Sequence, residues 1–503
     1  MRKILRFLYR LLLPPAKINT VFSYEDVERI IRDAEQKYPV DTWCYHGFHI
    51  WPMIRIELSF ALTQFERRGL FLRCWLGIAS FLRKLIPSDK VCPEPLPGDF
   101  KEKFPDVTVA YLDETPIDST GRQSKDMFFL NPFRQRGYGV MRFTEAIEKT
   151  DKLPFSSYAL DFEFGERFAE PLPSWYADYC KIYASAGLPA NKILDTAASV
   201  VRMSEFYYEE LRKTNLKLLL IECWYSPIVY ALALACRKLG IVTVDVQHGL
   251  ANRHHPSYGF WTKIPDGGYE IMPMYFWRWS QKQLEEMTLT CPDLVRTAGF
   301  FVGGNQPLYQ GLKDAFHAEP ELYFSFKERL KGRTVIALCL SRLDTERVEQ
   351  FIAALKQASG DFFWLFRFHP QDPNREFYVK LLGQKVTEES ADYTVCNSLS
   401  IYELLSLSHV AVSDISTVLQ EGLAFGRPGV VLSQDGCNMY REDIEAGVVL
   451  PALKEADFLN AIGAALKIPS EKCVAASQRY FCLEEDAEKA IDKFIGEIHL
   501  KKS

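Results

Sequence analysis

Three histidines follow a short apolar run in this sequence of 503 residues, which holds nine histidines in all. They are His248, His254 and His255, and the first stands in the motif Gln247-His248-Gly249. A neutral imidazole, with a pKa of about 6.5, is a suitable general base near neutral pH, and a neighbouring glycine lets a substrate approach closely. We therefore take His248 as the candidate catalytic base and the other four residues as further site candidates. Ligands at these three histidine positions match no familiar metal spacing, so no metal is expected.

A second group of polar residues stands at the end of the apolar run at 362–368 and includes Arg367 and His369. The proline after His369 favours an extended backbone, which lets the ring project from the end of a strand. Arginine and histidine side chains bind phosphate groups through charge-assisted hydrogen bonds. The pair is thus a candidate diphosphate site; the alternative is a histidine whose polar atoms are satisfied by nearby backbone.

A third group opens the stretch DISTVLQE and includes Asp414, Ser416 and Thr417. It lies between an expected strand and an expected helix, where unbonded N–H groups, the helix dipole and two hydroxyls favour an anion. Ordinary helix capping is the alternative, because these residue types are common caps. Glu421, one turn later, is expected to bind a ribose, or else to be a solvated carboxylate. We expect the strand before Asp414 to neighbour the strand before His369.

Apolar runs and helical periodicity predict the elements that position these groups. Residues 216–222 and 241–246 read as buried parallel strands, joined by a helix over 226–239 that ends at Gly240. This βαβ unit places His248 just beyond the carboxyl end of a strand, where open α/β sheets bind ligands. From residue 333 onward, strands and helices alternate again, which predicts a second parallel sheet covered by helices on both faces.

The expected fold is therefore α/β, with two Rossmann-like domains whose parallel sheets face each other across a cleft. The first would span residues 106–310 and the second 311–503. Residues 1–105 would form an N-terminal helical extension, separated from the first domain by a proline-dense linker over 87–105.

The first thirteen residues, MRKILRFLYRLLL, are too short to cross a bilayer and lack a signal-peptide cleavage site. As a helix they would gather their basic residues in one arc, which suits binding to an anionic membrane surface; packing on the protein body is the alternative. The twelve cysteines contain no CxxC pair, as expected in a reducing cytosol, and the net charge of −5 argues against a nucleic-acid partner.

Several catalytic motifs do not occur in the sequence. It contains no Asp-x-Asp pair, phosphate-binding GxxxxGK[ST] loop, GxSxG elbow or GxGxxG fingerprint. Kinase, serine-hydrolase and dinucleotide-dependent activities lose their main support. No metal or other cofactor is expected.

The Gln-His-Gly, His-Pro and Ser-Thr motifs, in this order over residues 216–451, resemble GT-B glycosyltransferases of bacterial surface-polysaccharide assembly. They are also similar to those of the teichoic-acid CDP-glycerol polymerases. Sialyl- and Kdo-transferases have an acidic residue where this sequence has His248. The resemblance implies that the first domain binds an acceptor and the second a nucleotide-activated donor.

The resemblance further implies that His248 deprotonates an acceptor hydroxyl, and that donor phosphate and ribose are bound in the second domain by Arg367, His369, Ser416, Thr417 and Glu421. The expected function is metal-independent transfer of a sugar from a nucleotide donor to a growing, lipid-linked surface polysaccharide such as a capsule, O-antigen or teichoic-acid-like polymer. Its expected place is the cytoplasmic face of the inner membrane. The alternatives are transfer of a phospho-polyol from a CDP-alcohol, or a non-catalytic, membrane-associated role in assembly.

Overall fold

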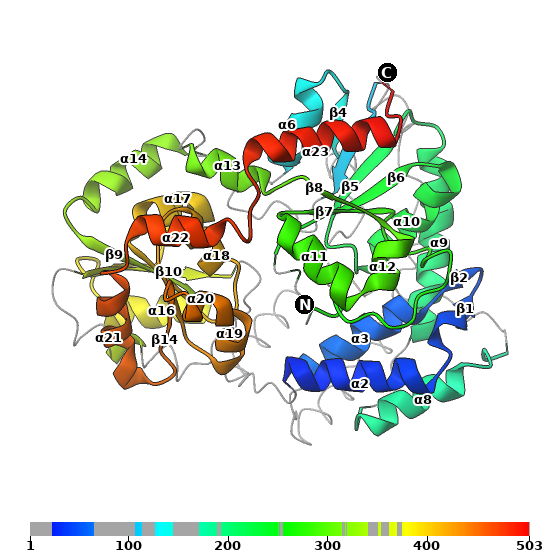
Figure 1. The fold of residues 1–503 in the computed structure, drawn as a ribbon, viewed down its shortest axis with the longest axis horizontal. Helices are drawn as coiled ribbons and strands as arrows, with labels where there is room; N and C mark the ends of the chain where they lie inside the picture. Colours follow the sequence, from blue (N-terminus) through cyan, green and yellow to red (C-terminus); the bar gives the residue numbers. More distant parts are fainter. Residues whose placement is uncertain are drawn as a thin grey trace, which may run out of the picture. The chain divides into compact units, whose positions relative to one another are not determined.

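The computed structural model describes residues 23–64, 106–112, 126–143, 171–188, 193–249, 251, 255–313, 317, 319–340, 351–353, 362–369 and 375–501. Residues 1–13, the linker over 87–105 and His254 lie outside these ranges. The described chain forms two compact units (Figure 1). We call Thr20–Pro307 with Phe481–Ser503 the N-terminal unit, and Leu308–Tyr480 the C-terminal unit.

The N-terminal unit is built on six parallel strands in the order β4-β3-β5-β6-β7-β8. Their bounds are β3 Val109–Leu112, β4 Val140–Arg142, β5 Leu218–Glu222, β6 Val242–Val246, β7 Tyr275–Arg278 and β8 Gly299–Val302. The predicted βαβ unit is confirmed: helix α10 (Pro227–Leu239) joins β5 to β6. It ends at Gly240, whose φ of 68° is the left-handed conformation that glycine adopts without strain.

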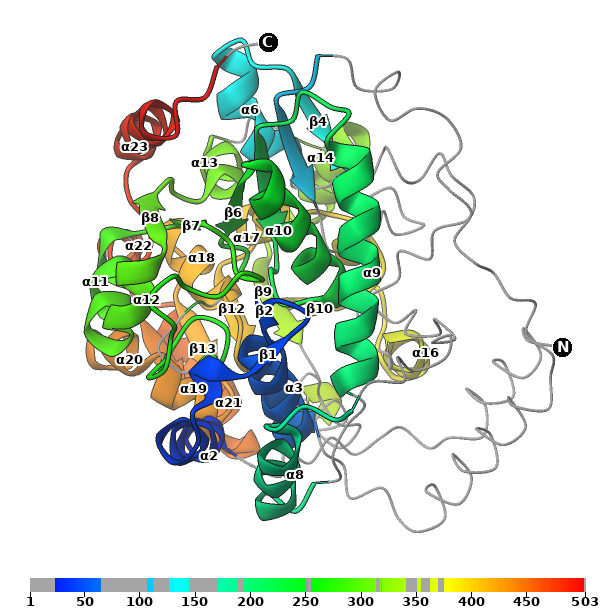
Figure 2. The same ribbon diagram turned by 90° about the vertical axis from the view of Figure 1, so that its right-hand side faces the viewer.

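Helices cover both faces of this sheet, which is why its strands are mostly apolar. On one face, α9 (Ile193–Leu211) and α10 lie side by side in both views (Figures 1 and 2). The remaining helices on that face are α2 Tyr24–Lys37, α3 Trp51–Gln64, α8 Tyr176–Ser185, α11 Gln281–Thr290 and α12 Pro292–Thr297. On the other face lie α6 (Asp126–Gln135) and α23 (Glu484–Glu497).

The described part of the predicted N-terminal extension is helical and belongs to the core of the N-terminal unit. Val27, Ile31 and Ile54 are buried in the same apolar cluster as Leu219 and Ile221 of β5. Between α2 and α3 lie a 3₁₀ turn, Val40–Thr42, and a short hairpin, β1 Cys44–Tyr45 with β2 Phe48–His49. Residues 23–64 are therefore integrated into this unit, although the sequence grouped them with a separate extension.

The C-terminal unit also contains six parallel strands, in the order β11-β10-β9-β12-β13-β14. Their bounds are β9 Thr334–Leu340, β10 Phe362–Phe368, β11 Ala391–Asp392, β12 Val410–Ser413, β13 Gly429–Val431 and β14 Val449–Pro451. The helices are α13 Gln306–Leu312, at the boundary of the units, α14 Pro320–Arg329, α16 Arg375–Lys385, α17 Ile401–Leu407, α18 Val418–Ala424, α19 Gln434–Met439, α20 Arg441–Glu445, α21 Glu455–Ala465 and α22 Ser470–Ser477, with a 3₁₀ turn at Val395–Asn397.

Two parallel-sheet α/β domains are therefore confirmed, but one predicted pairing is wrong. Strand β9 lies between β10, which leads to His369, and β12, which leads to Asp414, so these two strands are not neighbours. The reason is the order of crossovers: the chain adds β10 on one side of β9 and then returns to add β12 on the other side. This reversal is the topological switch point of the sheet.

The chain also crosses back between the units near its C-terminal end. Helix α23, red in Figure 1, packs on the sheet of the N-terminal unit, where the Phe494 and Phe301 rings stack at 4.3 Å. Arg136, just after α6, forms ion pairs with Glu488 and Asp492 of α23. Residues 481–501 thus complete the N-terminal unit, whereas the sequence grouped them with the second domain.

Candidate functional site

His248 lies in the loop after β6, and its neighbour Gln247 fixes the backbone on both sides of it. Gln247 is 1% exposed. Its Oε1 accepts the Trp279 N–H at 3.1 Å, and its Nε2 donates to the Gly249 carbonyl at 3.0 Å. Because both ends of its amide are bonded to backbone, the Gln247 side chain ties the chain at Gly249, just after His248, to the chain at Trp279.

Aromatic rings connect His248 with the second described histidine of the group. The ring of Tyr225, in the turn after β5, lies 6.4 Å from the His248 ring and 5.6 Å from the His255 ring. Tyr258 lies 4.8 Å from His255 on another side. Both histidines are half-buried. The structure therefore brings His248 and His255 together at the carboxyl edge of the sheet.

A buried carboxyl group, Asp245, lies behind this edge. Its Oδ1 accepts the Tyr258 hydroxyl at 3.2 Å and the Trp224 N–H at 3.3 Å. Cys223, just before Trp224, has a φ of 65°, a strained conformation for a non-glycine residue that sets the direction of this turn. Burial raises the pKa of Asp245 to about 7, although Arg278 opposes the shift.

Arg278 is a fully buried cation at the end of β7. Its guanidinium carbon lies 4.5 Å from the Tyr258 ring centre and 5.2 Å from that of Phe276. Among the described residues, none forms a hydrogen bond with its Nε, Nη1 or Nη2 atoms. Burial lowers the pKa of Arg278, and Asp245 opposes that shift. The sequence interpretation did not include Arg278, although a charged residue closing the apolar run YFWR was a detectable sign of a buried polar network.

In the C-terminal unit, Asp414, Ser416 and Thr417 follow β12 at the switch point between β9 and β12. The Ser416 Oγ accepts the Val418 N–H at 3.3 Å, and the hydroxyl of the buried Tyr440 donates to the Ser416 carbonyl. Thr417 is the N-cap of α18 without a side-chain capping bond. Part of the predicted capping alternative is thus observed at Ser416, while the Thr417 hydroxyl is not used for it.

Helix α19 supports the turn at Asp414 by close approach. A Cβ added at Gly436 would lie 2.4 Å from the Asp414 carbonyl oxygen, so only glycine fits there. Tyr440 comes one turn after Gly436 and bonds the Ser416 carbonyl. These supporting residues were not identified from the sequence, because a glycine in a six-residue helix has no distinctive pattern.

Arg367 and His369 lie at the end of β10 but differ in their surroundings. The Nη1 of Arg367 donates to the carbonyls of Cys396, at 2.8 Å, and Leu399, at 2.5 Å. Burial lowers the pKa of its guanidinium. His369 is exposed, and its N–H donates to the Leu340 carbonyl at 3.1 Å. Arg367 thus orders the loop before α17 through Nη1, while His369 is the more accessible of the two.

Glu421 is only 5% exposed, so the solvated alternative for this carboxylate does not apply. Its Oε1 accepts the Tyr402 hydroxyl at 3.1 Å. Asp414 is half-buried, and its Oδ1 has no hydrogen-bond partner among the described residues.

The candidates therefore form two groups, each at the carboxyl edge of one sheet. The N-terminal unit holds Gln247, His248, Gly249 and His255; the C-terminal unit holds Arg367, His369, Asp414, Ser416, Thr417 and Glu421. His254 lies outside the described residues. Within the described part of the chain, no three His, Cys, Asp or Glu residues gather in a way that could hold a metal ion.

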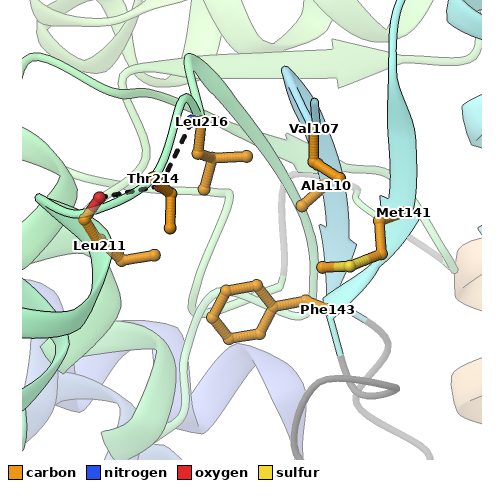
Figure 3. A pocket seen from close by; sticks show the side chains of 7 residues that line it. All are labelled: Val107, Ala110, Met141, Phe143, Leu211, Thr214 and Leu216. Carbon is orange, nitrogen blue, oxygen red and sulfur yellow. Dashed lines mark hydrogen bonds between the residues drawn. The ribbon is translucent and has the colours of Figure 1, made fainter. Parts of the chain in front are cut away.

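A small apolar pocket lies in the N-terminal unit (Figure 3). Val107 and Leu216 line it just before β3 and β5 begin, near the amino ends of these strands. Among the described residues that line it, the one hydroxyl, on Thr214, donates to the Leu211 carbonyl at 2.8 Å and accepts the Leu216 N–H at 3.3 Å. These described residues therefore offer no available polar side chain for chemistry.

Comparisons with known proteins give structural likenesses only. Neither a family model nor a curated protein matches the chain. Solved structures that match include S. aureus MnaA with UDP (10% identity, TM-score 0.47, 79% of this chain and 98% of that chain). Another is the UDP-GlcNAc 2-epimerase of Neisseria meningitidis bound to UDP-GlcNAc (11%, 0.46, 78% and 99%). A third is a UDP-forming trehalose-phosphate synthase of Burkholderia xenovorans (12%, 0.37, 63% and 81%).

No helix in the described part of the chain combines the length and the apolar character needed to cross a bilayer.

Proposed function

We propose that this protein is a metal-independent glycosyltransferase that moves a sugar from a nucleotide-activated donor to a hydroxyl of a surface polysaccharide. The observation that carries the proposal is the position of Asp414, Ser416 and Thr417. They follow β12 at the switch point of a sheet with the Rossmann strand order 3-2-1-4-5-6, where ligands of open α/β sheets bind.

In the proposed reaction, His248 accepts the proton of the acceptor hydroxyl as the oxygen attacks the anomeric carbon. The bond from that carbon to the donor phosphate breaks, and negative charge develops on the leaving phosphate. His369, Ser416 and Thr417 stabilise this charge, and preorganised donors at such a position supply much of the rate acceleration. Arg367 acts mainly by ordering the loop, given its Nη1 bonds to backbone.

Glu421 is proposed to bind the ribose of the donor. Its carboxylate is held by Tyr402, which fixes the direction of the group before a nucleotide binds. A carboxylate accepts hydrogen bonds, so a hydroxylated ligand suits this place better than an apolar one.

The test is a product assay of the purified protein with UDP-, GDP-, CDP- and CMP-linked sugars and saccharide acceptors, without added metal. CDP-glycerol belongs in the panel, since its consumption would favour the phospho-polyol alternative. UDP-GlcNAc without acceptor is also needed: formation of its 2-epimer would replace the transferase proposal. Failure of every donor to react would leave the non-catalytic role.

Variants at the proposed donor site sharpen this test. His369→Ala and Ser416→Ala should weaken donor binding in isothermal titration by about 1.5–3 kcal/mol for each charge-assisted bond that is lost. His409→Ala is the matched control, because its Nδ1 accepts the Val335 N–H at the other end of the sheet. Unchanged donor affinity in both site variants would contradict the assignment.

His248→Ala tests the base. Turnover should fall by roughly 10²- to 10⁴-fold while donor affinity and melting temperature persist. Near-normal turnover at saturating substrates would refute this role.

Membrane docking through residues 2–13 remains part of the proposal, motivated by their basic and apolar residues. A peripheral enzyme at the cytoplasmic face of the inner membrane would there meet lipid-linked acceptors. Flotation with anionic liposomes should decrease when residues 1–13 are deleted, since each basic residue near such a surface contributes about 1 kcal/mol. Equal flotation of the deleted form would remove the idea.

A further inference from the structure

His255 differs from His248 in having one ring nitrogen fixed by the backbone. The Ser257 N–H donates to its Nδ1 at 3.2 Å. A nitrogen that accepts a hydrogen bond from an amide carries no proton, so the neutral ring bears its proton on Nε2. Among the described residues, none forms a hydrogen bond with this Nε2, and the ring is only half-buried. The ring therefore has an N–H to offer.

The turn that carries His255 is rigidly held. The Tyr258 and Gly259 N–H groups donate to the His255 carbonyl at 3.0 and 2.7 Å. The Gly259 carbonyl accepts from Nη2 of Arg55, a fully buried residue of α3, at 2.8 Å. The direction of the imidazole is thus set by the fold before any ligand binds.

The surroundings of His255 oppose a second proton on its ring. Burial, His248 and the buried cations Arg278 and Arg55 lower the pKa of His255 to about 3. Among the described residues, the other groups that face the ring are the phenols of Tyr225 and Tyr258, which are not charged near neutral pH. Asp245, the nearest acid on β6, is bonded to Tyr258 rather than to the imidazole.

We infer that His255 is a neutral hydrogen-bond donor that presents its Nε2–H to an oxygen atom of the substrate beside His248. The inference rests on the proposed function, in which His248 removes a proton from a hydroxyl. A ring with this tautomer cannot serve as a base through Nε2. His248 therefore accepts the proton, and His255 donates a hydrogen bond to an oxygen atom. A donor in this position would hold a neighbouring hydroxyl or ring oxygen of the acceptor.

The first measurement is independent of activity. In ¹⁵N-histidine NMR of the full chain, assigned with His255→Gln and His248→Gln variants, the His255 ring should keep one proton, on Nε2, from pH 8 to pH 5. A ring that gains a second proton in this range, or that carries its proton on Nδ1, overturns the inference.

The second measurement uses turnover. His255→Phe keeps a ring but no donor and should lower kcat/KM by roughly tenfold or more, while His255→Gln, which retains an N–H donor, should recover part of the loss. The pH profile of kcat should keep its shape in both variants, because neither variant removes His248, the proposed base. The exposed His499→Gln is the control. Equal kcat/KM in wild type and His255→Phe overturns the inference.

The two proposals fail in different ways. If the wild-type protein turns over no donor, the proposed function fails. The NMR titration still tests the donor itself, because a ring that stays neutral with Nε2–H can donate to a ligand oxygen and a ring that gains a second proton is not the neutral donor inferred.

Discussion

Replacing Asp245 by asparagine should remove a defined part of the pH dependence of stability. Asparagine has the same shape and still accepts the Trp224 and Tyr258 hydrogen bonds through Oδ1, but it does not titrate. In the folded protein the pKa of Asp245 is about 7, against 3.8 for an ordinary aspartate. Because the folded pKa is the higher one, the folded state binds the proton more tightly. The stabilisation is fully present below about pH 4 and is lost as the pH rises through 7.

Between pH 5 and pH 8 the wild-type N-terminal unit should therefore lose about 2–3 kcal/mol through this group, at about 1.4 kcal/mol for each pKa unit. The assay is native-state hydrogen exchange by mass spectrometry on peptides covering β6, corrected for the intrinsic exchange rates at each pH. The pH effect of other groups cancels when wild type and Asp245→Asn are compared. At pH 5 the Asp245 carboxyl is largely protonated, so asparagine changes no charge beside Arg278 there; the two proteins differ in charge at this position only as the pH rises through about 7.

Asp266→Asn is the matched control, because that carboxylate is fully exposed. It should leave the difference between pH 5 and pH 8 unchanged. If Asp245→Asn shows the same difference as wild type, within about 0.5 kcal/mol, the carboxyl is not proton-linked and the buried network has been misread.

Three further substitutions test the supports of the site. Gln247→Ala should raise amide exchange of the loop around His248 and destabilise the unit by about 1–3 kcal/mol, because the buried Trp279 N–H and the half-buried Gly249 carbonyl lose their partner; unchanged exchange would contradict its positioning role. Gly436→Ala should displace the turn before α18, lower the melting temperature and weaken donor binding in titration, whereas Gly463→Ala, whose Cβ meets no neighbour, should do neither. Glu35→Ala should lower the free energy of unfolding in urea by about 3–5 kcal/mol, because it leaves the buried guanidinium of Arg55 without its ion-pair partner. A loss below 1 kcal/mol would refute this role of the ion pair.

The sequence predicted the helices and strands that have a clear local signal, such as an apolar run or a glycine at the end of a helix. Apolar runs such as 216–222 and 362–368 became central strands, and Gly240 ended its helix as expected. Strand order was beyond this reasoning, because the same apolar run fits either side of β9. Nothing local in residues 481–501 showed that they would cover the other unit, since an amphipathic helix such as α23 suits any apolar face.

For the candidate site, too, local sequence patterns indicated some residues, while others depend on contacts between distant parts of the chain. Motif residues such as His248 and Ser416 could be found because strand ends are visible in the sequence. The residues that support them could not be predicted, because residues such as Asp245 and Arg278 come together only when β6 pairs with β7. Glu421 was expected on a ribose or in solvent, and its burial beside Tyr402 depends on how α17 packs on α18.

The return of α23 to the N-terminal unit has a consequence during synthesis of the chain. Strand β8 ends at Val302 and α23 begins at Glu484, about 180 residues later. At about 5–20 residues per second, the ribosome needs on the order of 10–40 s to make that interval. Throughout it, the sheet face that will receive Ile491 and Phe494 has no cover from α23. A nascent chain therefore carries an open apolar face while its C-terminal unit is still being translated, and this is the period in which a chaperone would bind it.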